Sequence, residues 1–165
     1  MHVPHYHLSD PKDDNEEHAS TAPEYTNISK DYKINLAFHQ VTSMDGNATL
    51  AQMVADAQGV NTISPTWFSV TDNNGTISSL ASADYVNQAH AMGMEVWGLI
   101  DNFNSGTDNL TFLSSTAARA NIIQQLMTQA ASVGLDGINL DFESITEEQA
   151  PHYIQFVREL SIACR

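Results

Sequence analysis

A single pattern recurs from residue 33 to the end of the chain, and it limits the folds that the chain can adopt. Each repeat has a short apolar run rich in β-branched residues, a polar loop, an amphipathic helix and a glycine that ends the helix. The apolar runs predict strands at residues 34–41, 62–70, 95–101 and 137–142, and the periodic segments predict helices at 50–57, 83–92, 117–133 and 151–164. Strands that alternate with such helices favour parallel, right-handed βαβ connections, so the chain is predicted to be an α/β protein.

The predicted helices carry their own start and stop signals. Ser82 and one of residues 114–116 can cap the amino ends of the second and third helices. Gly59, Gly93 and Gly134 stand where a left-handed residue ends a helix, and each precedes the next strand by only a few residues. These signals place short connections between the helices and the strands that follow them.

Two architectures fit this pattern: an open doubly wound sheet and an eight-stranded barrel. The first unit has no glycine-rich phosphate loop, and its strand ends in His39-Gln40-Val41-Thr42, which lowers the case for a nucleotide-binding sheet. Polar or aromatic residues stand at the ends of the other strands, where a barrel builds its reaction site. We therefore predict parallel (β/α) units of a TIM-type barrel, about four units or half a barrel.

The fourth strand carries acidic side chains at alternate positions, in Asp136-Gly137-Ile138-Asn139-Leu140-Asp141-Phe142-Glu143. In a strand, Asp141 and Glu143 lie on one face. Two neighbouring carboxylates tend to ionise one after the other, which suits general acid catalysis. The alternative is a strand end whose acids meet solvent or cap the next helix.

Composition narrows the functions that fit. The chain has 165 residues with 42% apolar content, enough for one domain with a real core. Its net charge of −14 argues against binding to nucleic acid or to an anionic membrane by simple electrostatics, since both need clustered positive charge. No run approaches the roughly 18 apolar residues of a membrane span. Cys164 is the one cysteine, so no disulfide framework forms within the chain.

Residues 1–32 differ from the rest, and we interpret them as a flexible segment, with residues 33–165 as the barrel part. The segment lacks the basic-then-apolar order of a signal peptide, and the compartment is left open. A histidine cluster within it could chelate a metal, but without a rigid scaffold we expect no metal and no cofactor. The cluster consists of His2, His5, His7 and His18.

The motifs together resemble glycoside hydrolase family 18, the chitinase-like TIM barrels. Residues 136–143 are similar to the D-x-x-D-x-D-x-E signature of strand four in that family, and residues 61–68, 85–90 and 96–103 support the likeness. The closest resemblance is to the bacterial branch linked to spore germination and peptidoglycan lysis. It implies an extracellular, cell-wall or spore setting and a polysaccharide substrate.

The resemblance implies a substrate-assisted retaining glycosidase that cleaves β-1,4 linkages next to N-acetylated sugars, in peptidoglycan or a chitin-like glycan. Glu143 would be the general acid/base, and Asp141 would orient the acetamido group that attacks the anomeric carbon. The expected substrate-binding residues are Asn139, Asp136, Trp67, Asp101, Asn102 and His39. Aromatic residues could stack on sugars or belong to the core, and we assign Trp67 to the site and Trp97 to packing.

The sequence departs from the family pattern in charge and in length. Asn139 replaces the middle Asp of the signature, which puts a proton relay there in doubt, and the Ser-x-Gly-Gly of chitinase strand three is missing. A barrel of this type needs about 250 residues. We therefore expect part of a longer protein, or self-association, or a second chain that completes the barrel. The alternative function is a catalytically incompetent half-barrel that acts as a glycan-binding or assembly module.

Overall fold

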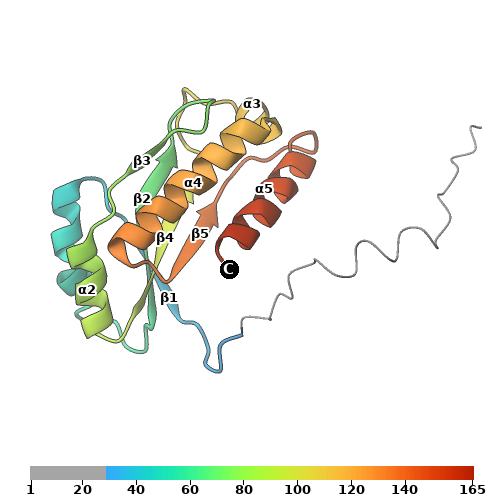
Figure 1. The fold of residues 1–165 in the computed structure, drawn as a ribbon. Coiled ribbons are helices and arrows are strands. Elements are labelled where there is room, and N and C mark those ends of the chain that lie inside the picture. Colours follow the sequence, from blue (N-terminus) through green and yellow to red (C-terminus); the bar gives the residue numbers. More distant parts are fainter. Residues whose placement is uncertain (1–28) are drawn as a thin grey trace, which may run out of the picture. The chain divides into compact units, whose positions relative to one another are not determined.

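The computed structural model describes residues 29–165, of which Ile34–Arg165 form one compact unit. Its strands are β1 (Leu36–His39), β2 (Thr62–Val70), β3 (Ile77–Ser79), β4 (Glu95–Asp101) and β5 (Gly137–Asp141). Its helices are the 3-10 helix η1 (Met44–Thr49), α1 (Leu50–Met53), α2 (Ala83–Ala91), α3 (Asn109–Ser114), α4 (Thr116–Val133) and α5 (Ala150–Ala163). Figure 1 shows them in chain order. No helix in residues 29–165 combines the length and the apolar composition that a membrane span requires.

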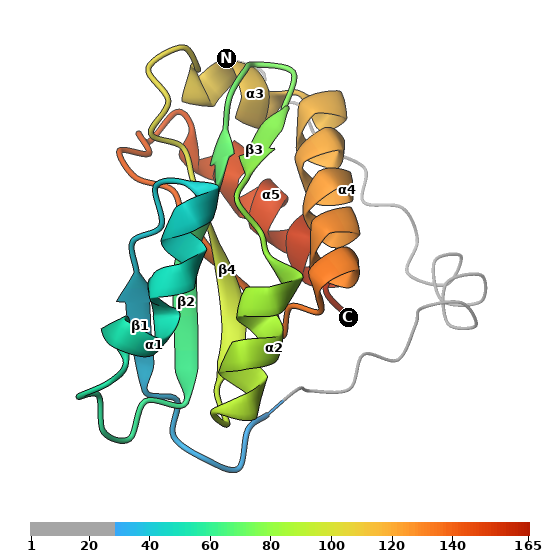
Figure 2. The ribbon, with the colours of Figure 1, turned by 90° about the vertical axis from the view of Figure 1, so that its left-hand side faces the viewer.

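The strands form one sheet in the order β1-β2-β4-β5, and every neighbouring pair in this order is parallel. The short β3 pairs antiparallel with the end of β2. Figure 2 shows β1, β2 and β4 running side by side. Four parallel strands joined by helices confirm the predicted α/β class, and the arrangement is consistent with part of a (β/α) barrel.

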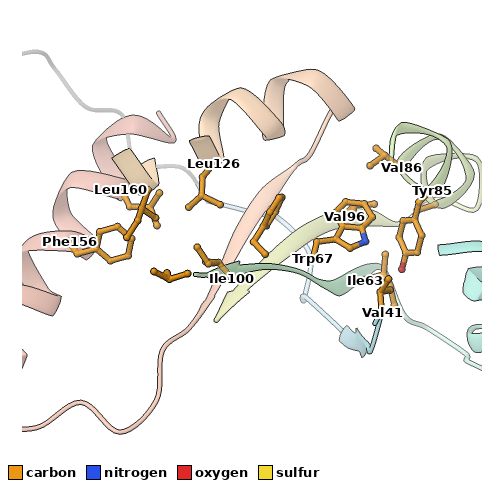
Figure 3. Packing of buried hydrophobic residues seen from close by; sticks show 14 of the residues in the cluster. Val41, Ile63, Trp67, Tyr85, Val86, Val96, Ile100, Leu126, Phe156 and Leu160 are labelled. Atoms are coloured by element: carbon orange, nitrogen blue, oxygen red, sulfur yellow. The ribbon is translucent and has the colours of Figure 1, made fainter. Parts of the chain in front are cut away.

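The sheet has one face against the helices and one face away from them. Side chains alternate between the two faces along each strand. Ile63, Val96 and Ile100 are fully buried in a core that also takes in Leu126 of α4 and Phe156 of α5 (Figure 3). We call the other side the open face. By register and alternation it carries Phe38, Ser64, Thr66, Trp97, Leu99, Asp101, Asn139 and Asp141.

A register shift in β2 changes which of its side chains face the helices. Thr66 pairs with Leu99, but Phe68 pairs with Ile100, so one extra residue lies between these pairs. Trp67 and Phe68 are therefore both in the core, at 1% exposure each. Beyond the shift, Ser69 pairs with Asp101 and lies on the open face. The bulge thus brings a serine hydroxyl to the carboxyl end of β4.

The start and stop signals predicted from the sequence for α2 and α4 are confirmed. The side chains of Ser82 and Ser115 accept the backbone N–H groups of Tyr85 and Ala118 and so cap α2 and α4. The predicted glycines have φ of +76° to +79°, the left-handed conformation that suits glycine. They are Gly59, Gly93 and Gly134. Gly93 and Gly134 follow the ends of α2 and α4, but Gly59 does not end a helix as predicted, because α1 already ends at Met53.

Other elements differ from the prediction. The first strand is limited to Leu36–His39, because its pairing with β2 covers only these residues. The helix expected at 50–57 is the four-residue α1, preceded by η1, in which Ser43 accepts the N–H of Gly46. The hairpin strand β3 and the helix α3 were not predicted. β3 has three residues and α3 has six, and both are too short to show a clear apolar period.

Candidate functional site

Three carboxylates gather at the carboxyl ends of β4 and β5. Asp101 and Asp141 are register partners, so they stand side by side on the open face with about 4.8 Å between their strands. Glu143 follows two residues later and is exposed. Between them, Phe142 packs on the helix side against Phe112 and Phe156, so Asp141 and Glu143 flank a residue that points to the core. The predicted acidic pair therefore stands at the carboxyl end of β5, with Asp141 half-buried and Glu143 exposed.

The carboxylate of Asp101 is held in place by two donors. The hydroxyl of Ser69 donates to its Oδ1 at 2.6 Å, and the backbone N–H of Phe103 donates to the same oxygen at 3.2 Å. Hydrogen bonds to a carboxylate are stronger than neutral ones and shorten accordingly. Asp101 is thus fixed next to Asp141, as the sequence placed it, whereas the contribution of Ser69 depends on the bulge and carries no local sequence signal.

Asn102 also lies at this edge, but its side chain forms its hydrogen bonds within the protein. Its side-chain amide bonds both backbone groups of Glu143 and the side chain of Asn109, and only 9% of the residue is exposed. Its side-chain nitrogen and oxygen thus face protein partners, whereas we expected them from the sequence to bind substrate. The sequence did not indicate Asn109, because the six residues of α3 are too few to show a helical period.

Asn139 lies on the open face two residues before Asp141. Its Nδ2 donates to the hydroxyl of Ser64 at 3.1 Å, and that hydroxyl donates to the carbonyl of Trp97 at 2.8 Å. Since the single hydroxyl hydrogen of Ser64 goes to the carbonyl, the serine oxygen must accept from Asn139. Asn139 therefore ties β5 to β2 across β4, in the layer beneath Asp141.

His39 does not lie on the rim of the site, contrary to its predicted role. It is 5% exposed, and its ring faces the helix layer, where Nδ1 bonds the hydroxyl of Tyr85 at 2.8 Å and Nε2 bonds Thr49 at 3.0 Å. The hydroxyl of Thr49 donates to the carbonyl of Gly46, so Thr49 accepts from Nε2–H and Nδ1 accepts from Tyr85. This chain of bonds requires the neutral ring, and burial lowers the pKa of His39.

We expect the stability of the protein to fall as the pH drops below about 6.5, the ordinary histidine pKa. The pKa of His39 is lower in the folded state, so the unfolded chain binds the proton more readily between the two values. The stabilisation is complete above the unfolded pKa and decreases toward the folded one. Urea unfolding from pH 8 to pH 5 measures it, and His39→Gln should flatten the dependence. An unchanged dependence in that variant would contradict this assignment.

Asp136 lies at the wrong end of the strand for a substrate contact. It precedes β5, and the five-residue rise to Asp141 is about 16 Å. Its Oδ2 accepts the N–H of Val96 at 2.8 Å and pairs with Nε2 of His90 at 2.7 Å. It also lines a cavity of about 350 Å³ between the end of α4 and the end of α5. Asp136 therefore joins the last turn of α2 to the amino ends of β4 and β5, and the structure does not bring it to the carboxylates of Asp101 and Asp141.

Trp67 is likewise a core residue and not a sugar platform. It is 1% exposed, its indole N–H donates to Asn47 Oδ1 at 2.7 Å, and its ring meets Tyr85 edge to face at 5.0 Å between centroids (Figure 3). Alternation from the buried Ile63 puts it on the helix side of β2. Phe103, directly after Asn102, is the aromatic residue that is exposed beside the carboxylates, at 56%.

Within residues 29–165, no three His, Cys, Asp or Glu side chains are arranged to hold a metal ion. The carboxylate edge is therefore described by its acids and their hydrogen bonds. The histidine cluster near the start of the chain, the one place where the sequence raised a metal, lies outside the described residues.

Comparisons with known proteins relate this fold to glycan-cleaving enzymes. No family model matches the chain. An uncharacterized glycosylase, YvbX of Bacillus subtilis, is 26% identical over 98 residues, which cover 56% of this chain and 28% of that protein. The C-terminal domain of a protein described as a chitinase from Desulfitobacterium hafniense superposes with a TM-score of 0.64 at 20% identity, covering 81% of this chain and 44% of that one.

The spore cortex-lytic enzyme SleL of Bacillus cereus superposes with a TM-score of 0.65 at 18% identity. It is matched over 79% of this chain and 32% of its own. At these identities the comparisons establish a shared fold, and the chain spans less than half the length of each of these proteins. The chain thus has the α/β fold found in chitinases and in a spore cortex-lytic enzyme.

Proposed function

We propose that this protein is a glycoside hydrolase that cleaves β-1,4 linkages next to N-acetylated sugars, in peptidoglycan or a chitin-like glycan. The observation that carries the proposal is the acidic edge of the sheet, where Asp101 and Asp141 are in register and Glu143 follows in an exposed position. The likeness in fold to chitinases and to a cortex-lytic enzyme supports it.

In this proposal Glu143 protonates the glycosidic oxygen as the bond to the anomeric carbon breaks. The carbonyl oxygen of the substrate's own N-acetyl group attacks that carbon and forms a positively charged oxazolinium ring. Asp141 stands on the same open face and balances the charge of this ring while orienting the amide. Water activated by the Glu143 carboxylate then opens the ring. This scheme departs from the usual two-carboxylate reaction of glycosidases.

Other residues of the same edge have supporting roles in the proposal. Asp101 adds a second fixed carboxylate beside Asp141, held by Ser69. Phe103 offers an exposed aromatic face directly after β4, and aromatic faces suit the apolar side of a sugar ring. Asn139, two residues before Asp141, donates a hydrogen bond to Ser64 and so fixes β5 against β2 directly beneath Asp141.

The chemistry predicts a requirement for the N-acetyl group. Oligomers of N-acetylglucosamine should be cleaved at least about tenfold faster than oligomers of glucosamine of equal length, because the free amine cannot form the oxazolinium ring. Reducing-end release measures both rates at saturating substrate. Equal rates would favour a different hydrolase that uses its acid pair without help from the substrate.

A second candidate is a glycan-binding or assembly module that does not turn over. It is favoured by the edges of the sheet, since β1 and β5 each pair with a single strand within the described residues, and by Phe38, which is 62% exposed on the open face. Such a sheet edge and exposed apolar face suit association with a second copy, another chain or a further segment of the same polypeptide. Binding of spore peptidoglycan without release of reducing ends, by a protein that self-associates in sedimentation, would support this function over hydrolysis.

A further inference from the structure

The side chain of Asn102 forms a two-point contact with the backbone of Glu143. Its Oδ1 accepts the Glu143 N–H at 2.9 Å, and its Nδ2 donates to the Glu143 carbonyl at 3.0 Å. A backbone N–H can only donate and a carbonyl can only accept, so these partners determine the orientation of the amide. We call this pair of bonds the Asn102 clamp.

The Asn102 clamp extends the sheet past the end of its ladder. The last register pair of β4 and β5 is Asp101 with Asp141. Two residues beyond it on the β5 side, the amide of Asn102 replaces a strand peptide and bonds both polar groups of Glu143. Glu143 is therefore tied to β4 although β5 has already ended at Asp141.

The surroundings of the clamp show why Glu143 needs to be held. Ser144, the next residue, has φ of +57°, a left-handed conformation that is unfavourable for a residue with a side chain. Such conformations persist only where neighbouring contacts enforce them. The second hydrogen of the Asn102 amide goes to Asn109 Oδ1 at 3.0 Å, so the first turn of α3 fixes the amide itself.

We infer that Asn102 is a positioning residue that sets the direction of the Glu143 carboxylate by clamping the Glu143 backbone. This inference rests on the proposed function, in which that carboxylate delivers a proton. The side chain of Glu143 starts from a backbone that is bonded on both sides of its Cα, so loss of the clamp lets the carboxylate swing relative to Asp141. Misplacement of a reacting group by about 1 Å can lower a rate about 100-fold.

The kinetic test compares Asn102→Ala and Asn102→Asp with the unchanged protein. Removal of the clamp should lower kcat about 100-fold with KM within about threefold, because the substrate does not touch Asn102. Asn102→Asp keeps the shape and the acceptor but sets an oxygen against the Glu143 carbonyl, so kcat should fall again. Asn104→Ala, an exposed loop residue whose Oδ1 accepts from Gly106, is the matched control and should keep its kcat. A raised KM at unchanged kcat would overturn the inference.

Two further measurements separate this inference from the proposed function. In a Glu143→Gln background, Asn102→Ala should lower kcat by less than a further factor of about two, since the clamp acts only through Glu143. If Asn102→Ala lowered kcat by about 100-fold in this background too, the substitution would act independently of Glu143, and the inference would be overturned. Hydrogen exchange of the Glu143 amide should be at least tenfold faster in Asn102→Ala, and an unchanged rate would contradict the clamp. The proposed function fails on a different result, namely wild-type release by Glu143→Gln.

Discussion

Glu143→Gln should lower reducing-end release from N-acetylated glycan by about 10² to 10⁴-fold, the usual contribution of a positioned general acid. Glutamine keeps the size of the side chain and can still form hydrogen bonds, but it has no acidic proton to transfer to the leaving oxygen. The backbone contacts of Glu143 to Asn102 are unaffected, so the variant should keep its fold. Binding of the glycan should also persist, and KM should change little.

The matched control for this variant is Glu147→Gln. Glu147 is an exposed acid in the loop that leads to α5, four residues from Glu143. Its replacement by glutamine changes the net charge by the same amount as Glu143→Gln. It should keep wild-type release. If the two variants lost activity equally, the effect would come from net charge, and the role proposed for Glu143 would have no support.

Trp67→Ala should lower the free energy of unfolding by about 3 to 5 kcal/mol, the range for removal of a buried aromatic side chain. Trp67 is 1% exposed and meets Tyr85 and Phe68 edge to face. Its loss leaves a cavity and removes the donor to Asn47 Oδ1. Urea unfolding followed by circular dichroism measures the change.

Two companion variants make the result on Trp67 specific. Trp67→Phe keeps most of the side-chain volume but leaves Asn47 Oδ1 without its donor. It should lower the free energy of unfolding by about 1 to 3 kcal/mol and leave KM unchanged. Phe103→Ala removes an aromatic residue that is 56% exposed and should stay within about 0.5 kcal/mol of wild type. A Trp67→Phe protein of full stability and raised KM would return Trp67 to the glycan site.

The elements that could be predicted from the sequence are those whose own residues determine their ends. β2 and β4 agree with prediction residue for residue, because each is a run rich in β-branched and aromatic residues that a polar loop follows. α4 agrees within one residue, since its apolar stripe lies between the cap Ser115 and the left-handed Gly134. β1 could not be bounded in this way, because its length depends on its pairing with β2.

The candidate site was predicted in part, and the residues that lie elsewhere do so for separate physical reasons. Asp101, Asp141 and Glu143 meet because parallel strands end at one edge, which the strand pattern implies. Trp67 and His39 lie on the helix side, which we did not predict because the residue pattern of their strands does not show which face meets the helices. Asp136 lies at the amino end of β5, as its place before residue 137 implies.

The reassignment of Asn102 shows a third kind of limit. Its position after β4 was predicted correctly, but whether its amide faces a ligand or a backbone depends on the path of the chain after β5. That path includes the left-handed Ser144, and nothing in the residue types near it indicates the turn.

The central claim is that Glu143 donates a proton to the leaving oxygen, and the dependence of the rate on the leaving group tests it most directly. A dinitrophenyl glycoside of N-acetylglucosamine units departs without protonation, whereas a sugar leaving group needs it. Glu143→Gln should therefore lose about 10² to 10⁴-fold on the oligosaccharide but less than about tenfold on the dinitrophenyl glycoside. An equal loss on both substrates would contradict the role of Glu143 as the general acid.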